Sequence, residues 1–302
     1  MSQTRLIVRT PDDRQLDVLV DGPGDGLPLL YHAGTPGGLV APPPVTEQAT
    51  ARGLRTVMYS RPGYGGSTPM PGRRVADCAA DVAAVLDHLE VERFVTAGWS
   101  GGGPHALACA ALLPDRCLAA ASVAGVAPYG AEGLDWLAGM AEENLAEFAA
   151  AQEGEAALTG FLAVAENELR EITGPEVAAS LGGLVDEADT AVLTGEFADY
   201  LAASSRAALS SGVAGWRDDD LAFVADWGFE LAAGNSVPTA VWQGGQDRMV
   251  PAGHGSWLGS ELAAARVHLL PADGHLTLIT GRFGDIADDL LDLAGMAPGS
   301  PR

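Results

Sequence analysis

The sequence predicts an α/β protein whose mostly parallel sheet of eight strands carries helices on both faces and a helical insertion. Short apolar runs alternate with amphipathic segments over residues 1–127 and again over 237–302, a pattern typical of strands joined by helices. Between these ranges, residues 128–236 contain several helical patterns and no convincing strand. We therefore expect one core formed by 1–127 and 237–302, with 128–236 inserted as a helical cap.

Eight segments have the composition of strands. Arg5–Thr10 and Gln15–Val20 flank the turn at residues 11–14 and predict a hairpin at the start of the sheet. Leu27–Ala33 and Arg55–Arg61 are short, largely apolar runs, as expected of strands that are buried on both faces. The remaining predicted strands lie later in the chain, at Arg93–Ala97, Leu118–Ala127, Thr239–Gly244 and Arg266–Pro271.

Helical segments follow from apolar periodicity and from glycine and proline breakers. In Val75–Leu89 the apolar residues recur at spacings of three and four, which places them on one face. Gly102–Leu113 ends before Pro114, and two further core helices are expected near Gly253–Ala265 and Phe283–Leu293. Four helical patterns stand out in the insertion: Leu134–Ala151, Glu155–Ile172, Pro175–Leu184 and Glu196–Ser210.

Composition and charge limit the classes of function. The 302 residues are 47% hydrophobic, enough for a sizeable core, and their 40 acidic and 17 basic residues give a net charge of −23. All the basic residues are arginine, which excludes a lysine nucleophile or Schiff base. The negative charge argues against the cationic patch that nucleic acids and anionic membranes require. We expect a small-molecule substrate as the partner and leave a homodimer open.

The same reasoning bears on compartment and cofactors. No apolar stretch reaches the about 18 residues that span a bilayer, and the first residues lack the apolar segment of a secretory signal, so a cytoplasmic location is expected. Cys78, Cys109 and Cys117 are interpreted as small core residues rather than as a disulfide framework. No cluster of His, Cys and carboxylates has metal-ligand spacing, so neither a metal nor a cofactor is expected.

A Gly-x-Ser-x-Gly segment stands between a predicted strand and a predicted helix and has Ser100 at its centre. The pentapeptide alone is a weak signal, but this context is that of a nucleophile elbow. Such a turn is strained, and a Cβ at either flank would collide with neighbouring chain, which explains Gly98 and Gly102. Pro104 suits the first turn of the helix that follows. Ser100 is the predicted nucleophile; the alternative is that it only caps this helix.

A serine hydroxyl needs a base, and a neutral imidazole is the usual one. Among the six histidines, His275 lies in a turn just after the last predicted strand, where it could reach the carboxyl end of the sheet. It also completes the chain order Ser, acid, His. The other histidines are interpreted as structural: His32, His88, His105, His254 and His268.

The acid that orients the imidazole should lie in the loop after the strand that precedes the histidine strand. Asp247 occupies that loop, and the alternative is that it is an ordinary loop residue. Two competitors remain. Asp273 is too close to His275 in sequence to face it easily, and the run Asp218–Asp220 lies within the insertion.

Acyl transfer also requires donors for the developing oxyanion. The backbone N–H of Gly101, directly after the nucleophile, is one by geometry. The other should come from the loop after Leu27–Ala33, and we assign it to Thr35. Taken alone, this loop is only a Gly/Pro turn.

Together these residues resemble the α/β-hydrolase superfamily over essentially the whole chain, in particular its capped bacterial members related to esterases, epoxide hydrolases and proline iminopeptidases. The family's His-Gly-x-Pro motif corresponds to residues 33–36 with Ala33 at the histidine position, which leaves Gly34 as an alternative donor. Residues 59–67 resemble the family's Asp-x-Pro-Gly-x-Gly-x-Ser loop without its aspartate, and structural packing near the site is expected there. The resemblance implies an α/β-hydrolase fold.

The resemblance also narrows the chemistry. Ser100 stands where epoxide hydrolases and haloalkane dehalogenases carry an aspartate, which favours serine acyl chemistry of a carboxylesterase-like kind on a small, largely apolar ester, lactone or related acyl substrate. Aminopeptidase, carbon–carbon bond hydrolase and perhydrolase activities share this triad, and a non-catalytic ligand-binding protein of the same fold is a further alternative. Aromatic residues of the insertion are available either to line a pocket or to pack its helices together: Trp136, Phe148, Phe161, Trp216 and Trp227.

Overall fold

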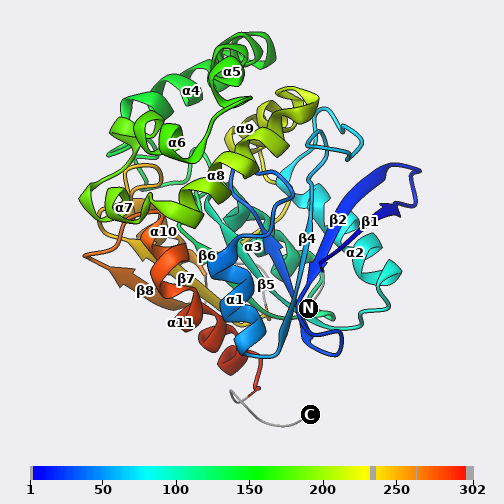
Figure 1. The fold of residues 1–302 in the computed structure, drawn as a ribbon. Coiled ribbons are helices and arrows are strands. Elements are labelled where there is room, and N and C mark those ends of the chain that lie inside the picture. Colours follow the sequence, from blue (N-terminus) through cyan, green and yellow to red (C-terminus); the bar gives the residue numbers. More distant parts are fainter. Residues whose placement is uncertain (1–2, 232–235, 263, 297–302) are drawn as a thin grey trace.

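The computed structural model of the protein describes residues 3–231, 236–262 and 264–296, and its centre is a single eight-stranded sheet (Figure 1). The strands are β1 (Thr4–Arg9), β2 (Gln15–Asp21), β3 (Leu27–His32), β4 (Leu54–Tyr59), β5 (Phe94–Trp99), β6 (Cys117–Val123), β7 (Thr239–Gly244) and β8 (Arg266–Leu270). Their order across the sheet is β1-β2-β4-β3-β5-β6-β7-β8. Strand β2 pairs antiparallel with β1 and β4, and every pairing from β4 to β8 is parallel.

Helices cover both faces of this sheet. They are α1 (Pro43–Ala51), α2 (Cys78–His88), α3 (Gly103–Leu112), α10 (Ala252–Glu261) and α11 (Thr277–Leu293), with 3-10 turns η1 (Val75–Asp77) and η2 (Ser100–Gly102). Because successive side chains of a strand point to opposite faces, Leu29 packs in the core layer under α1 and α11, and Leu30 packs in the layer under α2, α3 and α10. The sheet is thus buried on both sides.

All the elements between β6 and β7 are helical. They are α4 (Glu142–Glu153), α5 (Glu155–Leu169), α6 (Gly174–Ser180), η3 (Gly182–Leu184), α7 (Glu187–Val192), α8 (Gly195–Ala208), η4 (Leu209–Ser211) and α9 (Ala214–Val224). We name the range 142–224 the helical insertion. It leaves the sheet after the carboxyl end of β6 and lies at that end of the strands, away from both termini (Figure 1).

The structure differs from the sequence predictions mainly at helix ends. Helix α4 begins at Glu142 instead of Leu134, because residues 134–141 form turns. Helix α11 begins at Thr277, six residues before the predicted start near Phe283. Helices α7 and α9 lie outside the predicted ranges. No helix among the described residues is both long and apolar enough to cross a membrane.

Candidate active site

The turn between β5 and α3 holds Ser100 in a left-handed backbone conformation, with φ of 57°. A non-glycine residue in this region is strained by about 1–3 kcal/mol and persists only where its surroundings impose it. The surroundings are tight here: a Cβ on Gly98 would lie 2.0 Å from the carbonyl oxygen of Gly102, and a Cβ on Gly102 would lie 2.2 Å from that of His32. Glycine is therefore required on both sides of the serine, as the sequence predicted.

His275 and Asp247 meet in the loops that follow β8 and β7. His275 Nδ1 lies 2.8 Å from Asp247 Oδ2, and both side chains are buried. The second carboxylate oxygen, Asp247 Oδ1, accepts hydrogen bonds from the backbone N–H groups of Met249 at 2.9 Å and Val250 at 2.8 Å. The carboxylate is thus fixed in place by its own loop. Its contact with Nδ1 leaves Nε2 as the ring nitrogen available for proton transfer.

The charge on Asp247 also acts on the protonation of His275. Burial lowers the pKa of this imidazole, but the charge and hydrogen bond of Asp247, with a further contribution from Asp189, outweigh burial and raise the pKa above its ordinary value of 6.5. Asp189 belongs to helix α7 of the insertion. The surroundings of His275 therefore stabilise the imidazolium that general-base catalysis creates.

Ser100 and His275 line one cavity of about 560 Å³, within the usual range for small-molecule sites. Their side chains are not hydrogen-bonded to each other among the described contacts, and such bonds are often long before substrate binds. Trp99 connects the two residues, because its ring lies 5.3 Å from that of His275 and its indole N–H donates to the His275 carbonyl at 3.2 Å. The opposite wall comes from the helical insertion.

The loop after β3 lies against the serine turn. A Cβ on Gly34 would be 3.3 Å from Ser100 Cβ, and a Cβ on Gly101 would be 2.3 Å from Thr35 Oγ1. The backbone N–H of Thr35 donates to no acceptor among the described residues. Thr35 and Gly101 therefore lie next to each other beside Ser100, and their assignment as oxyanion donors stays a prediction.

A buried ion cluster holds this loop in place. Arg61, just after β4, donates to the carbonyl oxygens of Ala33 at 2.7 Å and Gly34 at 2.9 Å and to Thr35 Oγ1 at 2.9 Å. Its guanidinium also contacts Asp219 of helix α9 at 2.5 Å. Thr35 Oγ1 donates to the same carboxylate at 2.8 Å. Arg61 thus ties the loop after β3 to the helical insertion.

Asp219 is the centre of this cluster. It is fully buried and also accepts from Arg73 at 2.6 Å and from the Tyr64 hydroxyl at 2.8 Å. Burial raises the pKa of the Asp219 carboxyl, but Arg61 and Arg73 outweigh it and hold that pKa far below its usual range. The carboxylate is thus the counter-ion of both arginines.

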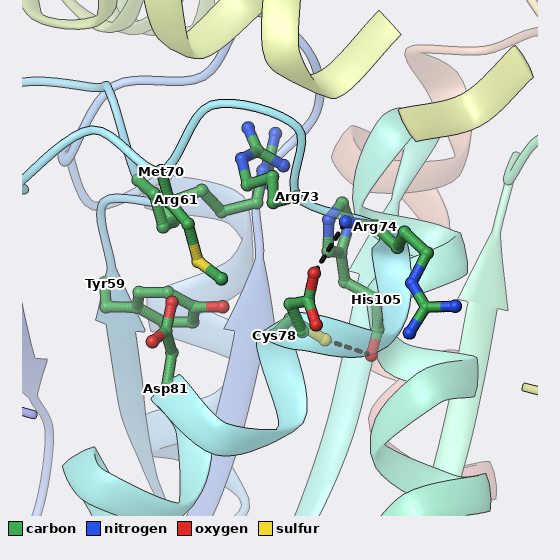
Figure 2. Close-up of a pocket in the computed structure, with 10 residues that line it drawn as sticks. Tyr59, Arg61, Met70, Arg73, Arg74, Cys78, Asp81 and His105 are labelled. Atoms are coloured by element: carbon green, nitrogen blue, oxygen red, sulfur yellow. Dashed lines mark hydrogen bonds between the residues drawn. The ribbon is translucent and has the colours of Figure 1, made fainter. Parts of the chain in front are cut away.

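Figure 2 shows Arg61 and Arg73 side by side at a second cavity, which Tyr59, Asp81 and His105 also line. This cavity measures about 10 Å³, room for about one water molecule. Burial, with a smaller contribution from Arg61, lowers the pKa of His105 to about 3, and its Nδ1 lies 2.9 Å from the Gly101 carbonyl. The second cavity is too small for a substrate. Of its residues, His105 contacts the serine turn and Arg61 binds the loop after β3.

A second acidic group faces the large cavity from the insertion. Glu147 of α4 and Asp220 of α9 both line it and interact with each other; Asp220 is buried and Glu147 is half-buried. The Trp216 indole donates to Glu147 at 2.6 Å. Burial raises the pKa of both carboxyl groups, and the charge of Glu147 raises that of Asp220 further. Burial and mutual repulsion thus favour a state in which one of the two carboxyl groups carries a proton.

The structure also resolves the competitors and the aromatic residues. Asp273 pairs with Arg282 at 3.1 Å instead of with His275. Among the aromatic residues, Phe148, Phe161 and Trp216 line the cavity. Two others do not: Trp136 packs against Phe148 and donates to the Ala127 carbonyl, and Trp227 stacks on Phe229. The three cysteines are buried and free, as predicted.

Sequence reasoning missed three functional candidates: Asp189, Glu147 and the role of Asp219. All three are acids of the insertion, and each acquires its role from partners far away in the sequence. The run of three aspartates offered one usable signal, because it lies between Trp216 and Phe223 on a segment that is otherwise apolar enough to be buried. Acids on a buried helix require partners.

Comparisons with known proteins agree with this fold. Residues 28–282 match the sequence model of a family described as the alpha/beta hydrolase fold. A non-heme chloroperoxidase of Streptomyces lividans is 36% identical over 111 residues, which are 35% of this chain and 40% of that relative. The chain therefore spans less than half the length of this curated relative.

Solved structures resemble the chain over nearly all of its length. A hydrolase from Pseudomonas aeruginosa superposes with a TM-score of 0.67 at 24% identity, covering 97% of this chain and 98% of that one. An enol-lactonase from Burkholderia xenovorans gives a TM-score of 0.62 at 20% identity, covering 96% and 100%. At these identities the likeness concerns the fold.

Proposed function

We propose that this chain, which belongs to the α/β-hydrolase fold family, is a serine hydrolase that cleaves an ester, lactone or related acyl bond of a small, largely apolar substrate. One observation carries the proposal. His275, whose Nδ1 lies 2.8 Å from Asp247, lines the same cavity as Ser100 in its strained turn. A nucleophile, a base and an orienting acid in this arrangement are what covalent acyl transfer requires.

In the proposed reaction, Ser100 Oγ attacks the substrate carbonyl carbon while His275 Nε2 takes the hydroxyl proton. The carbonyl electron pair moves onto oxygen, and the N–H groups of Gly101 and Thr35 stabilise that oxyanion. When the tetrahedral intermediate collapses, the leaving alkoxide takes the proton from His275 and an acyl-Ser100 ester remains. Water then attacks this ester with His275 as base, and the acid is released. Asp247 holds the ring and stabilises its charged form.

The size and lining of the cavity set the proposed substrate class. A volume of about 560 Å³ accommodates a small molecule. Phe148, Phe161 and Trp216 present aromatic surface from the insertion, which favours an apolar substrate. We propose that residues 128–236 act as a cap that closes this cavity over Ser100.

A second candidate is cleavage next to an amine, as in an aminopeptidase, and the Glu147–Asp220 pair favours it. Asp220 lies one helical turn from Phe223 on α9, and the Phe223 ring is 3.0 Å from where a Gly101 Cβ would be. Gly101, Glu147 and Asp220 all line the same large cavity. A protonated amine could replace the proton of the acid pair there. Carbon–carbon bond hydrolysis and perhydrolysis, as well as ligand binding without turnover, have no comparable observation in their favour.

A substrate panel distinguishes these candidates. Initial rates should be measured with p-nitrophenyl esters, lactones and aminoacyl-naphthylamides, using Ser100→Ala as the blank and the exposed Ser260→Ala as the matched control. The proposal predicts Ser100-dependent hydrolysis of esters or lactones. Preference for the aminoacyl substrates, lost in Asp220→Asn, would favour the second candidate. Absence of Ser100-dependent turnover across the panel would contradict both.

A further inference from the structure

Asp189 lies in helix α7 of the insertion, yet its partners belong to the loop of the candidate catalytic histidine. Its Oδ2 accepts a hydrogen bond from the backbone N–H of His275 at 2.7 Å. Its Oδ1 accepts from the N–H groups of Leu276 at 2.8 Å and Thr277 at 3.0 Å. The residue is 0% exposed. One carboxylate of the helical insertion therefore binds three successive backbone N–H groups, beginning with that of His275.

The local chain is built around this contact. A Cβ on Gly274 would lie 2.5 Å from the Asp189 carboxylate, so only glycine lets the carboxylate approach the loop. On the other side, Asp186 caps helix α7 by accepting from the Asp189 N–H at 2.8 Å. The Gly274 N–H donates to Thr277 Oγ1 at 2.7 Å, which closes the turn around the bound oxygen atoms. Both partners are thus shaped to hold the carboxylate at the start of α11.

We propose that Asp189 is a positioning residue for His275. From the helical insertion it fixes the backbone of the histidine and places a second negative charge near the imidazole, so that catalysis requires the insertion to be docked on this loop. The inference rests on the proposed function, because it assumes that His275 is the base. The contact does not involve the reacting atoms. Asp189 acts through the backbone of His275, whereas Asp247 contacts its ring.

A purely structural role predicts something different. Three N–H groups at a helix start are the groups that an acidic side chain normally caps, and such a cap would only stabilise α11 and attach the insertion to the core. The two roles differ in their effect on His275. A structural cap changes the free energy of unfolding, whereas a positioning residue also changes kcat and the pH dependence of the base.

The charged groups around His275 make the pH dependence interpretable. Asp247 faces the ring from the loop after β7, and Asp189 faces it from α7; both raise its pKa against the effect of burial. Strand β5 contributes the Trp99 ring. On the histidine's own loop, Asp273 is paired with Arg282 of α11. Removing the Asp189 charge should therefore lower the pKa of His275.

The test compares Asp189→Asn with Asp273→Asn. Both variants remove one carboxylate close to His275, but only the first removes the acceptor of its backbone N–H. For each variant and the parent, kcat, KM and the pH profile of kcat/KM should be measured with the best substrate of the panel, and folding should be followed by circular dichroism and thermal melting. Ser100-dependent turnover by the parent is established first, so that a failure of the proposed function is recognised separately.

For Asp189→Asn we expect kcat to fall about tenfold or more, because a small misplacement of a catalytic group has a large effect on rate. The acidic limb of kcat/KM should move to lower pH, and KM should change by less than about threefold. Asp273→Asn should resemble the parent in kcat and in the position of the limb. If the two variants share the parent's kcat and limb, even with a lower melting temperature for Asp189→Asn, the inference is wrong.

If Asp189→Asn does not fold, Gly274→Ala decides the question. Its methyl group would displace the carboxylate from the loop while leaving every charge in the protein unchanged. The inference predicts a loss of kcat of at least about tenfold in the folded variant. A kcat and acidic limb equal to those of the parent would overturn it.

Discussion

Replacement of Asp219 by asparagine tests how the insertion supports the loop after β3, which carries Thr35. The carboxylate is fully buried and contacts Arg61 at 2.5 Å, Arg73 at 2.6 Å, Tyr64 at 2.8 Å and Thr35 at 2.8 Å. Asparagine has one acceptor oxygen and no charge, so Asp219→Asn leaves two buried guanidinium groups without their counter-ion. Removal of one partner from a buried ion pair destabilises a protein by about 3–5 kcal/mol.

The structure places the expected effect at the lower end of this range. Arg61 keeps its bonds to the carbonyl oxygens of Ala33 and Gly34, and Arg73 keeps a bond to that of Gly215. We therefore expect a loss of about 3 kcal/mol, which at about 2 °C per kcal/mol lowers the melting temperature by roughly 6 °C.

Activity should fall as well, because Thr35 Oγ1 loses its acceptor and the loop its anchor. Loss of an oxyanion donor costs about 10²–10³ in kcat, and a displaced donor should cost about tenfold or more. Thermal melts and kcat for a p-nitrophenyl ester measure both effects. Asp226→Asn is the control, since Asp226 is exposed and lies 3.9 Å from Arg74. A melting temperature and kcat indistinguishable from those of this control would refute the reasoning.

Three further predictions concern the triad and its turn. Asp247→Asn should lower kcat by up to about 10⁴-fold, because the imidazole would adopt the wrong tautomer. A kcat within a few-fold of the parent would mean that another acid, such as Asp273 or one of the insertion, orients His275. The neutral imidazole of His275 is the base, and its pKa is raised above 6.5. A plot of kcat/KM should therefore rise with pH through a midpoint above 6.5. A rate independent of pH from about 5 to 8 would contradict a histidine base. Gly98→Ala should abolish activity or folding, because its methyl group would lie 2.0 Å from a backbone oxygen. The control Gly160→Ala, whose methyl group points into open space, should be tolerated. An active, stable Gly98→Ala would refute the steric argument.

The order of strands and helices could be predicted because each depends on local pattern. Short apolar runs indicate buried strands wherever they occur, and the nucleophile turn is recognisable because its steric requirements select glycine at fixed positions. Ser100 was predicted from this turn. His275 and Asp247 were predicted from chain order and from their loops after predicted strands, since the carboxyl ends of parallel strands meet at one edge of the sheet.

The parts that escaped prediction depend on distant partners. Helix α11 begins at Thr277 because the start of the helix is bound by Asp189, which lies 88 residues earlier. Likewise, α9 has no clear apolar period because Asp219 is buried against arginines that follow β4. The acid pair of Glu147 and Asp220 joins two helices of the insertion whose contact no periodicity reveals. Such side chains resemble solvent-exposed acids until the fold brings their partners to them.

The most direct test of the central claim is covalent labelling of Ser100. The protein should be incubated with an active-site phosphonate and its intact mass measured, with Ser100→Ala treated in parallel and turnover followed for both. We predict one adduct on the parent and none on the variant, together with a loss of kcat of about 10³-fold or more. An unlabelled parent, an adduct retained in Ser100→Ala, or near-normal turnover by that variant would contradict a serine nucleophile at this site.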